Sequence, residues 1–254
     1  MRIRRTTLSL WLPMALAIAW SGRASADMLL AVEGSLAWQS RNEARIPGAG
    51  GTRFSIADLA KGPAADYRVY LGYKIAERHE LRALYAPFGV EVDGRLAEPV
   101  DFAGSSFATG ADTQAFYRFN SYRLTYAYHL DPVGDWRFAF GFTAKIRDAE
   151  IRLRQGPLEA SKKNLGFVPL LNFQAANEFA EDWTFRFDLD GLMAPQGRAF
   201  DGALFLERRL AYFGAAHAFS VFGGYRTIEG GANNDEVFNF AWIHKLVFGL
   251  RGDF

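Results

Sequence analysis

Charged side chains recur on every second residue in several stretches of the chain. In one of them, Arg186, Asp188 and Asp190 alternate with apolar residues. Side chains two residues apart lie on the same face of an extended strand, so these carboxylates could do acid and base work or could each neutralise a basic neighbour. We predict one polar network from such positions, formed by Arg123, Lys145, Arg147, Arg186, Asp188, Asp190, Glu207, Arg209 and Lys245.

The residues between these charges are apolar and often aromatic, which predicts long strands with two unlike faces. Trp136, Phe138, Phe140 and Phe142 show the clearest alternation. A proline cannot donate to a strand ladder, so Pro87 is expected to mark a bulge. In all, the pattern predicts strands near 28–40, 66–75, 80–95, 113–130, 136–153, 165–179, 183–190, 200–210, 219–228 and 238–254.

The last strand is about three times as long as a typical globular strand. One face of it is largely aromatic, the other carries Asn239, Lys245 and Arg251, and the chain ends in Phe254. A long strand that is apolar on one side fits a closed barrel that crosses a bilayer.

The first residues have the features of a secretory signal peptide. A positive start is followed by an apolar stretch from Leu8 to Trp20 and by small residues at Ala24 and Ala26. We therefore expect cleavage between Ala26 and Asp27, with residues 1–26 as the signal and 27–254 as one barrel domain.

Removing that signal changes the sign of the net charge. The chain has 29 Lys and Arg and 28 Asp and Glu, and the four arginines of the signal leave 25 bases against 28 acids, a net charge of −3. No basic tract predicts a nucleic-acid partner. Cysteine is absent, so neither disulfides nor thiol chemistry is expected.

Short and longer connections alternate along the expected strands. The stretches 76–79, 131–135 and 180–182 are expected turns, whereas 96–112, 156–164 and 229–235 are expected loops. This asymmetry predicts an all-β, antiparallel, up-and-down transmembrane barrel of about ten strands, with its longer loops outside the cell. The alternative is a soluble β-sandwich, which strands of this length disfavour.

With its signal, its amphipathic strands and its terminal strand, the chain resembles the small outer-membrane β-barrel proteins of Gram-negative bacteria. The resemblance implies an outer-membrane location among outer-membrane lipids and lipopolysaccharide. It also implies that Phe248, Leu250 and Phe254 are read by the barrel-assembly machinery, although Gly252 departs from that pattern. Two further segments, 117–124 and 194–200, look like motifs without a known counterpart.

The expected function is that of a non-enzymatic barrel, structural or interacting through its extracellular loops. Ten strands enclose little more space than side chains can fill, so mixed interior charges favour a plug of ion pairs. The alternatives are a narrow channel that favours anions and an outer-membrane hydrolase, either lipid A-modifying or protease-like. The four histidines all fall outside the expected extracellular loops, and the sequence predicts no catalytic site, metal or cofactor. They are His79, His129, His217 and His244.

Overall fold

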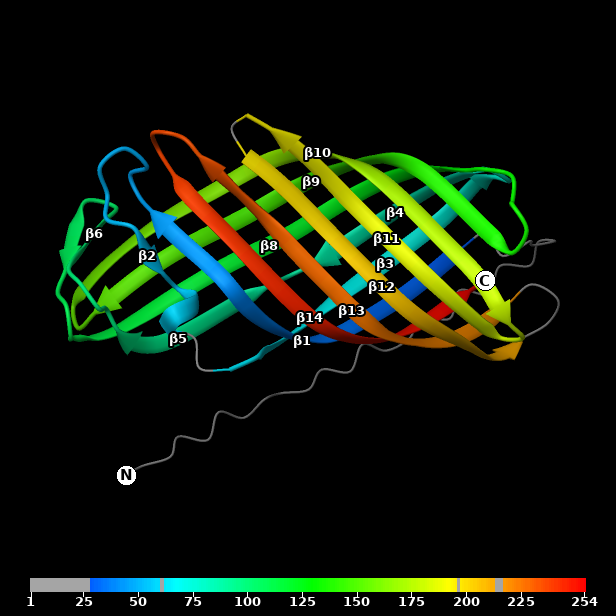
Figure 1. Ribbon diagram of the computed structural model, residues 1–254, viewed down its shortest axis with the longest axis horizontal. Helices are drawn as coiled ribbons and strands as arrows, with labels where there is room; N and C mark the ends of the chain where they lie inside the picture. The colour runs from blue at the N-terminus through cyan, green and yellow to red at the C-terminus, as the bar shows by residue number, and fades with distance from the viewer. Residues whose placement is uncertain (1–27, 60–61, 196, 213–216) are drawn as a thin grey trace, which may run out of the picture.

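The long strands close on themselves as a single antiparallel barrel (Figure 1). The computed structural model describes residues 28–59, 62–195, 197–212 and 217–254. The last strand pairs with the first. Met28 N donates to Phe254 O (3.0 Å) and Phe254 N donates to Met28 O (2.8 Å), which completes the ladder at the seam. Closure pairs the two edge strands that an open sheet would expose.

Ten strand positions make up the wall. They are β1 (Met28–Arg45), β3 (Ala64–Ala76), β4 (His79–Ala86) together with β5 (Gly89–Arg95), β8 (Asp112–His129), β9 (Trp136–Gln155), β10 (Leu158–Ala180), β11 (Trp183–Ala194), β12 (Gly197–Tyr212), β13 (Ala218–Asn233) and β14 (Phe238–Asp253). The connections hold three short strands and one 3₁₀ helix: β2 (Phe54–Ser55), β6 (Val100–Phe102), β7 (Ser105–Phe107) and η1 (Ala57–Leu59). No helix in the described residues is long and apolar enough to span a bilayer.

The strand expected over 80–95 is broken into β4 and β5, which both pair with β8. The break lies at Pro87, which has no N–H to donate. Beside it, Phe88 N donates to the Asn120 side-chain oxygen (3.1 Å), while Phe119 N still donates to Phe88 O (2.8 Å). The register against β8 is the same before and after Pro87, so Pro87 marks a short gap in the ladder rather than a bulge.

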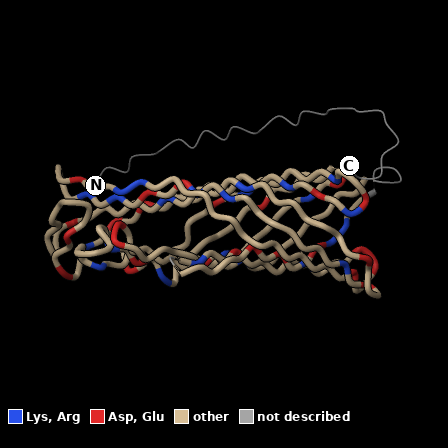
Figure 2. Tube along the Cα trace, turned by 90° about the horizontal axis from the view of Figure 1, so that it is seen from above, with Lys and Arg blue, Asp and Glu red and all other residues tan. Residues whose placement is uncertain are grey.

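Buried and more exposed positions alternate along much of β8, β9 and β14. Residues of both charge signs occur along the length of the cylinder (Figure 2). Phe140 and Phe248 point outward and are 51% and 59% exposed. Their inward neighbours Ala139 and Val247 are buried. An apolar outer surface around a closed barrel is solvated by lipid, not by water. The expected fold class, an all-β transmembrane barrel with ten strand positions, is confirmed.

The two ends of the barrel differ. We call the end with Met28 and Phe254 the terminal end and the opposite end the loop end. Two of the expected loops at the loop end are wrong: β10 begins at Leu158, directly after Gly156 and Pro157, and β13 runs on to Asn233. These strand ends carry polar residues on their outward face because they extend past the apolar outer surface, so the alternation that predicts a strand is lost there.

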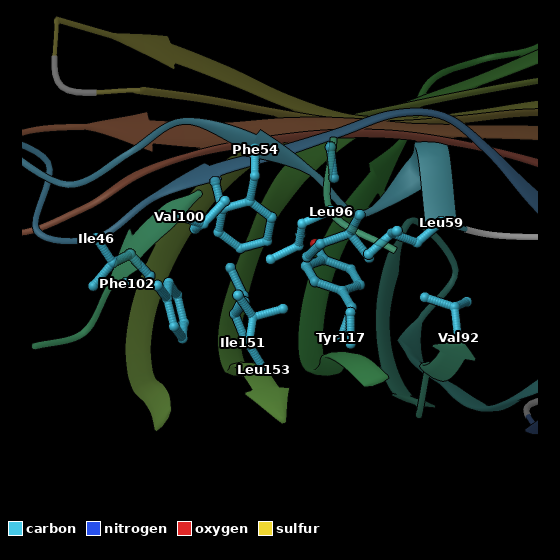
Figure 3. Close-up of a cluster of buried hydrophobic side chains, with 14 of the residues drawn as sticks. Ile46, Phe54, Leu59, Val92, Leu96, Val100, Phe102, Tyr117, Ile151 and Leu153 are labelled. Atoms are coloured by element: carbon cyan, nitrogen blue, oxygen red, sulfur yellow. The ribbon is translucent and has the colours of Figure 1, made fainter. Parts of the chain in front are cut away.

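The long connections of the loop end fold inward as an apolar cap (Figure 3). We define the apolar cap as Ile46, Phe54, Ile56, Leu59, Phe88, Leu96, Val100, Phe102 and Phe107. It packs on inward residues of the wall, chiefly Tyr117, Ile151 and Leu153. Phe102 is fully buried and Phe107 is 1% exposed. Burying each such ring stabilises the cap by about 1.5–3 kcal/mol, so these connections form a folded plug.

The expected signal residues Ala24 and Ala26, with Asp27, lie outside the described residues. Of the expected assembly signal, Phe248, Leu250 and Phe254 point outward on β14 and at its end, each about half exposed. A side chain at Gly252 would collide with the Phe254 ring, since its Cβ would lie 2.7 Å from the ring edge. Phe254 thus occupies the space that an apolar residue at position 252 would fill.

We predict that deleting Phe254 lowers the amount of folded barrel in cells without changing its synthesis. The deletion removes both hydrogen bonds of the seam to Met28 and the terminal aromatic ring. Pulse labelling measures synthesis, and the unheated mobility of the protein in detergent gels measures folding. Phe140→Ala, which truncates a ring within β9 that is 51% exposed like that of Phe254, is the control. Normal folded amounts of the deletion variant would contradict a role for Phe254 in assembly.

Candidate functional site

The interior of the barrel is organised around one carboxylate, that of Asp201 on β12. It accepts hydrogen bonds from Arg68 on β3 (3.0 Å), from Arg123 on β8 (2.6 Å) and from Arg226 on β13 (2.5 Å). All four side chains are nearly inaccessible to solvent. Three guanidinium groups from separate strands therefore converge on a single buried acid.

Two further acids balance these cations. Glu33 on β1 accepts from Arg226 Nε (2.9 Å), from its Nη2 (3.0 Å) and from the Tyr70 hydroxyl (3.1 Å). Asp190 on β11 accepts from Arg123 (2.7 Å), from Thr143 (2.7 Å) and from Asn172 (2.9 Å). We call these three acids and three arginines the central lattice: Glu33, Arg68, Arg123, Asp190, Asp201 and Arg226.

The predicted network overlaps only in part with the central lattice. Arg123 and Asp190 belong to both, while Asp201, Glu33, Arg68 and Arg226 are missing from the prediction. Asp201 lies an even number of residues from Glu207 and Arg209 on the same strand, so all three side chains lie on one face. This spacing is the signal that could have placed Asp201 in the barrel interior.

Most other members of the predicted network form ion pairs beside the lattice. Asp188 pairs with Arg82 (3.0 Å). Arg186 pairs with Glu207 (2.9 Å). Lys245 bonds to Asp66. Arg209 lies toward the terminal end, 3.5 Å from Glu178 and 3.7 Å from Asp182.

Lys145 and Arg147 differ from the rest of the network. Lys145 is 3% exposed, and its Nζ lies 4.6 Å from the centre of the Phe119 ring. Arg147 donates to the side-chain oxygen of Asn164. Within the described ranges, neither cation has an acidic partner.

The central lattice leaves almost no free space. The cavity among Arg68, Arg123, Asp190, Asp201 and Arg226 has a volume of about 10 Å³, which is about what one water molecule needs. Buried charges are stable only where they are paired and hydrogen-bonded. The acids and arginines of the central lattice are thus held in fixed pairs across the middle of the barrel.

The groups considered for catalysis are also engaged. Asp188 and Asp190 are each paired with an arginine, Asp188 with Arg82 (3.0 Å) and Asp190 with Arg123 (2.7 Å). His129 lies 2.9 Å from Glu80 and His79 lies 2.7 Å from the Tyr126 hydroxyl, both at the terminal end. In the part of the chain that the structure describes, no three His, Asp or Glu residues are grouped to hold a metal ion.

Comparison with known proteins supports the fold. No protein-family model and no curated protein sequence matches the chain. Among solved structures, the outer membrane protease OmpT from Escherichia coli is similar with a TM-score of 0.50 at 10% identity, over 91% of this chain and 97% of OmpT. Ail of Yersinia pestis, the attachment invasion locus protein, matches with a TM-score of 0.38 at 6% identity, over 88% of this chain and 99% of Ail.

At such low identity the likeness to OmpT shows the fold alone. Together with the closed barrel and its apolar outer surface, it defines the class: the chain is an integral outer-membrane β-barrel of the Gram-negative type. The expected location, the bacterial outer membrane, is confirmed at this level. In barrels of this class the long loops are extracellular, so we expect the loop end to face outward from the cell.

We predict that Asp201→Asn strongly destabilises the barrel. The amide keeps the size of the carboxylate but leaves three buried guanidinium groups without their shared charge, and breaking a buried ion pair from one side typically loses about 3–5 kcal/mol. Unfolding by guanidinium in detergent micelles measures the loss.

Asp112→Asn is the matched control, because Asp112 pairs with Arg95 at the surface and its side chain is 89% exposed. Exposed pairs contribute little to stability. Equal unfolding midpoints for the two variants would contradict the role given to Asp201.

Proposed function

We propose that this protein is a closed outer-membrane barrel that acts through the folded surface of its loop end. The observation that carries the proposal is the double closure of the lumen. The central lattice fills the middle of the barrel, and the apolar cap fills its outer mouth. A barrel closed in this way is suited to presenting a surface rather than to transport.

The loop end supports this proposal because its strands continue beyond the apolar outer surface as an ordered polar sheet. Outward charges are paired there across β8 and β9, with Arg118 3.0 Å from Asp148 and 3.1 Å from Glu150. Backbone bonds fix the connections, as where Ala103 N donates to Ile46 O (2.9 Å). Surface that is ordered before contact loses less entropy on binding a partner.

An open groove of about 950 Å³ crosses this surface between η1, β5, β8 and β9. Both signs of charge line it, with Asp58, Asp93 and Asp112 facing Arg95 and Arg154. Mixed, exposed charge suits a polar partner outside the cell, and specificity for such a partner would come from charge complementarity.

The other two functions find less support in the geometry. An anion channel would have to pass the central lattice, where about 10 Å³ is free. A hydrolase that used Asp188 or Asp190 would first have to break their contacts with Arg82 and Arg123.

Single-channel recording on the refolded protein tests the closure. We predict no stable conductance for the full chain. A variant with residues 97–111 replaced by a short Gly-Ser turn removes Val100, Phe102 and Phe107 from the apolar cap and keeps the central lattice, and it too should stay closed. Conductance of the variant but not of the full chain would mean that the apolar cap, and not the central lattice, closes the lumen. Reproducible conductance of the full chain would contradict the proposal.

A further inference from the structure

The wall of the barrel is incomplete beside β10, and we propose that this gap leads to a binding site at Lys145 for the anionic head of a single-chain amphiphile from the outer leaflet. The site is separate from the groove of the loop end. It rests on three features: an unpaired strand edge, a cavity that passes through the wall, and a buried cation without an acidic partner.

The first feature is where the pairing of β10 with β11 stops. On one side β10 pairs with β9 along its whole length, but on the other its pairing with β11 ends at Leu171 opposite Gly191. Pro169, which has no N–H, lies just beyond that point. Leu192, Met193 and Ala194 continue to pair with β12 only. The outer half of β10 therefore has a free edge.

This edge opens at the level of the lipid. Leu165 and Phe167 point outward on β10 and are 74% and 64% exposed, and Met193 across the gap is 70% exposed. The next outward position toward the loop end is the charged Lys163. The gap thus lies at the outer rim of the apolar surface, where unpaired backbone groups in lipid are costly unless something covers them.

The second feature is a cavity of about 240 Å³ behind the gap. Its lining includes both outward Phe167 and inward Val168, so it passes through the wall. Small residues on the opposite strands, Ala194, Ala199 and Gly230, leave the space unfilled. This volume is below the ~300–1,000 Å³ of sites that enclose a drug-sized ligand, so a head group and the first carbons fit while the tail stays in the membrane.

The third feature is the ammonium group of Lys145, which lines this cavity. No hydrogen bond or ion pair joins it to another residue in the described ranges, and its one contact of note is the Phe119 ring at 4.6 Å. The attraction of a cation to a ring does not offset the removal of a full charge from water. An anion in the cavity would supply the missing partner.

Arg147 adds a second cation two residues along on the same strand face. It bonds to the neutral Asn164 side chain, and its Nε is buried without a partner. Gly166 makes room for it, because a Cβ there would lie 3.2 Å from Arg147 Nη2. Arg198, the other cation of the lining, is already paired with Glu229 (2.5 Å). Two cations beside an apolar wall match a carboxylate or phosphate that carries a hydrocarbon chain.

Both unexplained sequence segments meet at this cavity. Phe119 of the segment 117–124 lies under Lys145, and Ala194, Gly197, Arg198 and Ala199 of the segment 194–200 form the opposite side. Their conspicuous composition is accounted for if they build one site.

Binding can be measured with spin-labelled stearate and the full barrel in phosphatidylcholine nanodiscs, where bound label gives an immobilised spectrum. We expect saturable binding by the wild type. Lys145→Met should weaken it about tenfold or more, the factor that corresponds to losing about 1.4 kcal/mol. Lys163→Met, which removes an exposed charge from the same hairpin, should bind as the wild type does. Equal binding by all three proteins would overturn the proposal.

Competition separates the two sources of an anionic head. Lysophosphatidic acid should displace the label, whereas inorganic phosphate in excess should displace it weakly, because phosphate lacks the chain that occupies the gap. Equal displacement by both would assign the site to free anions and overturn the amphiphile.

Stability supplies an independent readout. Removing an unpaired buried charge should leave the unfolding midpoint of Lys145→Met unchanged or raise it. If Lys145→Met is less stable and also binds weakly, its weak binding could come from misfolding. Leu192→Trp then tests the site separately, because it fills the cavity and keeps the lysine. Lost binding in Leu192→Trp supports the site, and retained binding overturns it.

Discussion

The structure depends on the desolvation of charge inside a cylinder that lipid surrounds. Bulk water reaches neither the outer surface nor the middle of the lumen, so each interior carboxylate must find its cations among the other strands. Asp201 does this with three arginines, and Glu33 and Asp190 complete the balance. The lattice ties β1, β3, β8, β11, β12 and β13 together across the barrel, which the backbone ladder between neighbouring strands cannot do.

The apolar cap fills the lumen at the loop end with apolar side chains instead of paired charges. There the lumen is filled by buried rings such as Phe102 and Phe107, which need no partners. The middle of the barrel cannot be filled in this way without losing the alternation of polar and apolar faces. Polar filling inside and apolar filling at the mouth are the two observations from which we propose the loop end as the part of the barrel that meets a partner.

The sequence predicted what depends on local alternation and missed what depends on closure. Phe140 and Phe248 could be placed toward lipid because side chains in a strand alternate. Residues 158–164 show no alternation that would predict a strand, because both faces of a strand are polar once it leaves the membrane. The pairing of Arg68 with Asp201 could not be predicted, since it crosses the lumen between strands far apart in the chain. For the same reason, the sequence does not show that Lys145 forms no ion pair with any acid among the described residues.

Lys145 differs from the cations of the central lattice because it has no acidic partner among the described residues. The one acid in the lining of its cavity, Glu229, is already paired with Arg198, and the wall opens beside Lys145 after Pro169. A barrel with paired charges throughout would need no such opening. The contrast between the closed lattice and the open gap separates the residues that hold the barrel together from those available to bind.

The most direct measurement of the central claim is the coupling free energy between Glu33 and Arg226, obtained from the unfolding of Glu33→Gln, Arg226→Gln and the double variant. If mutual pairing of desolvated charges holds the interior, each single variant loses about 3–5 kcal/mol and the double variant loses far less than their sum. Losses that simply add would mean that these charges do not depend on one another, and would contradict the account.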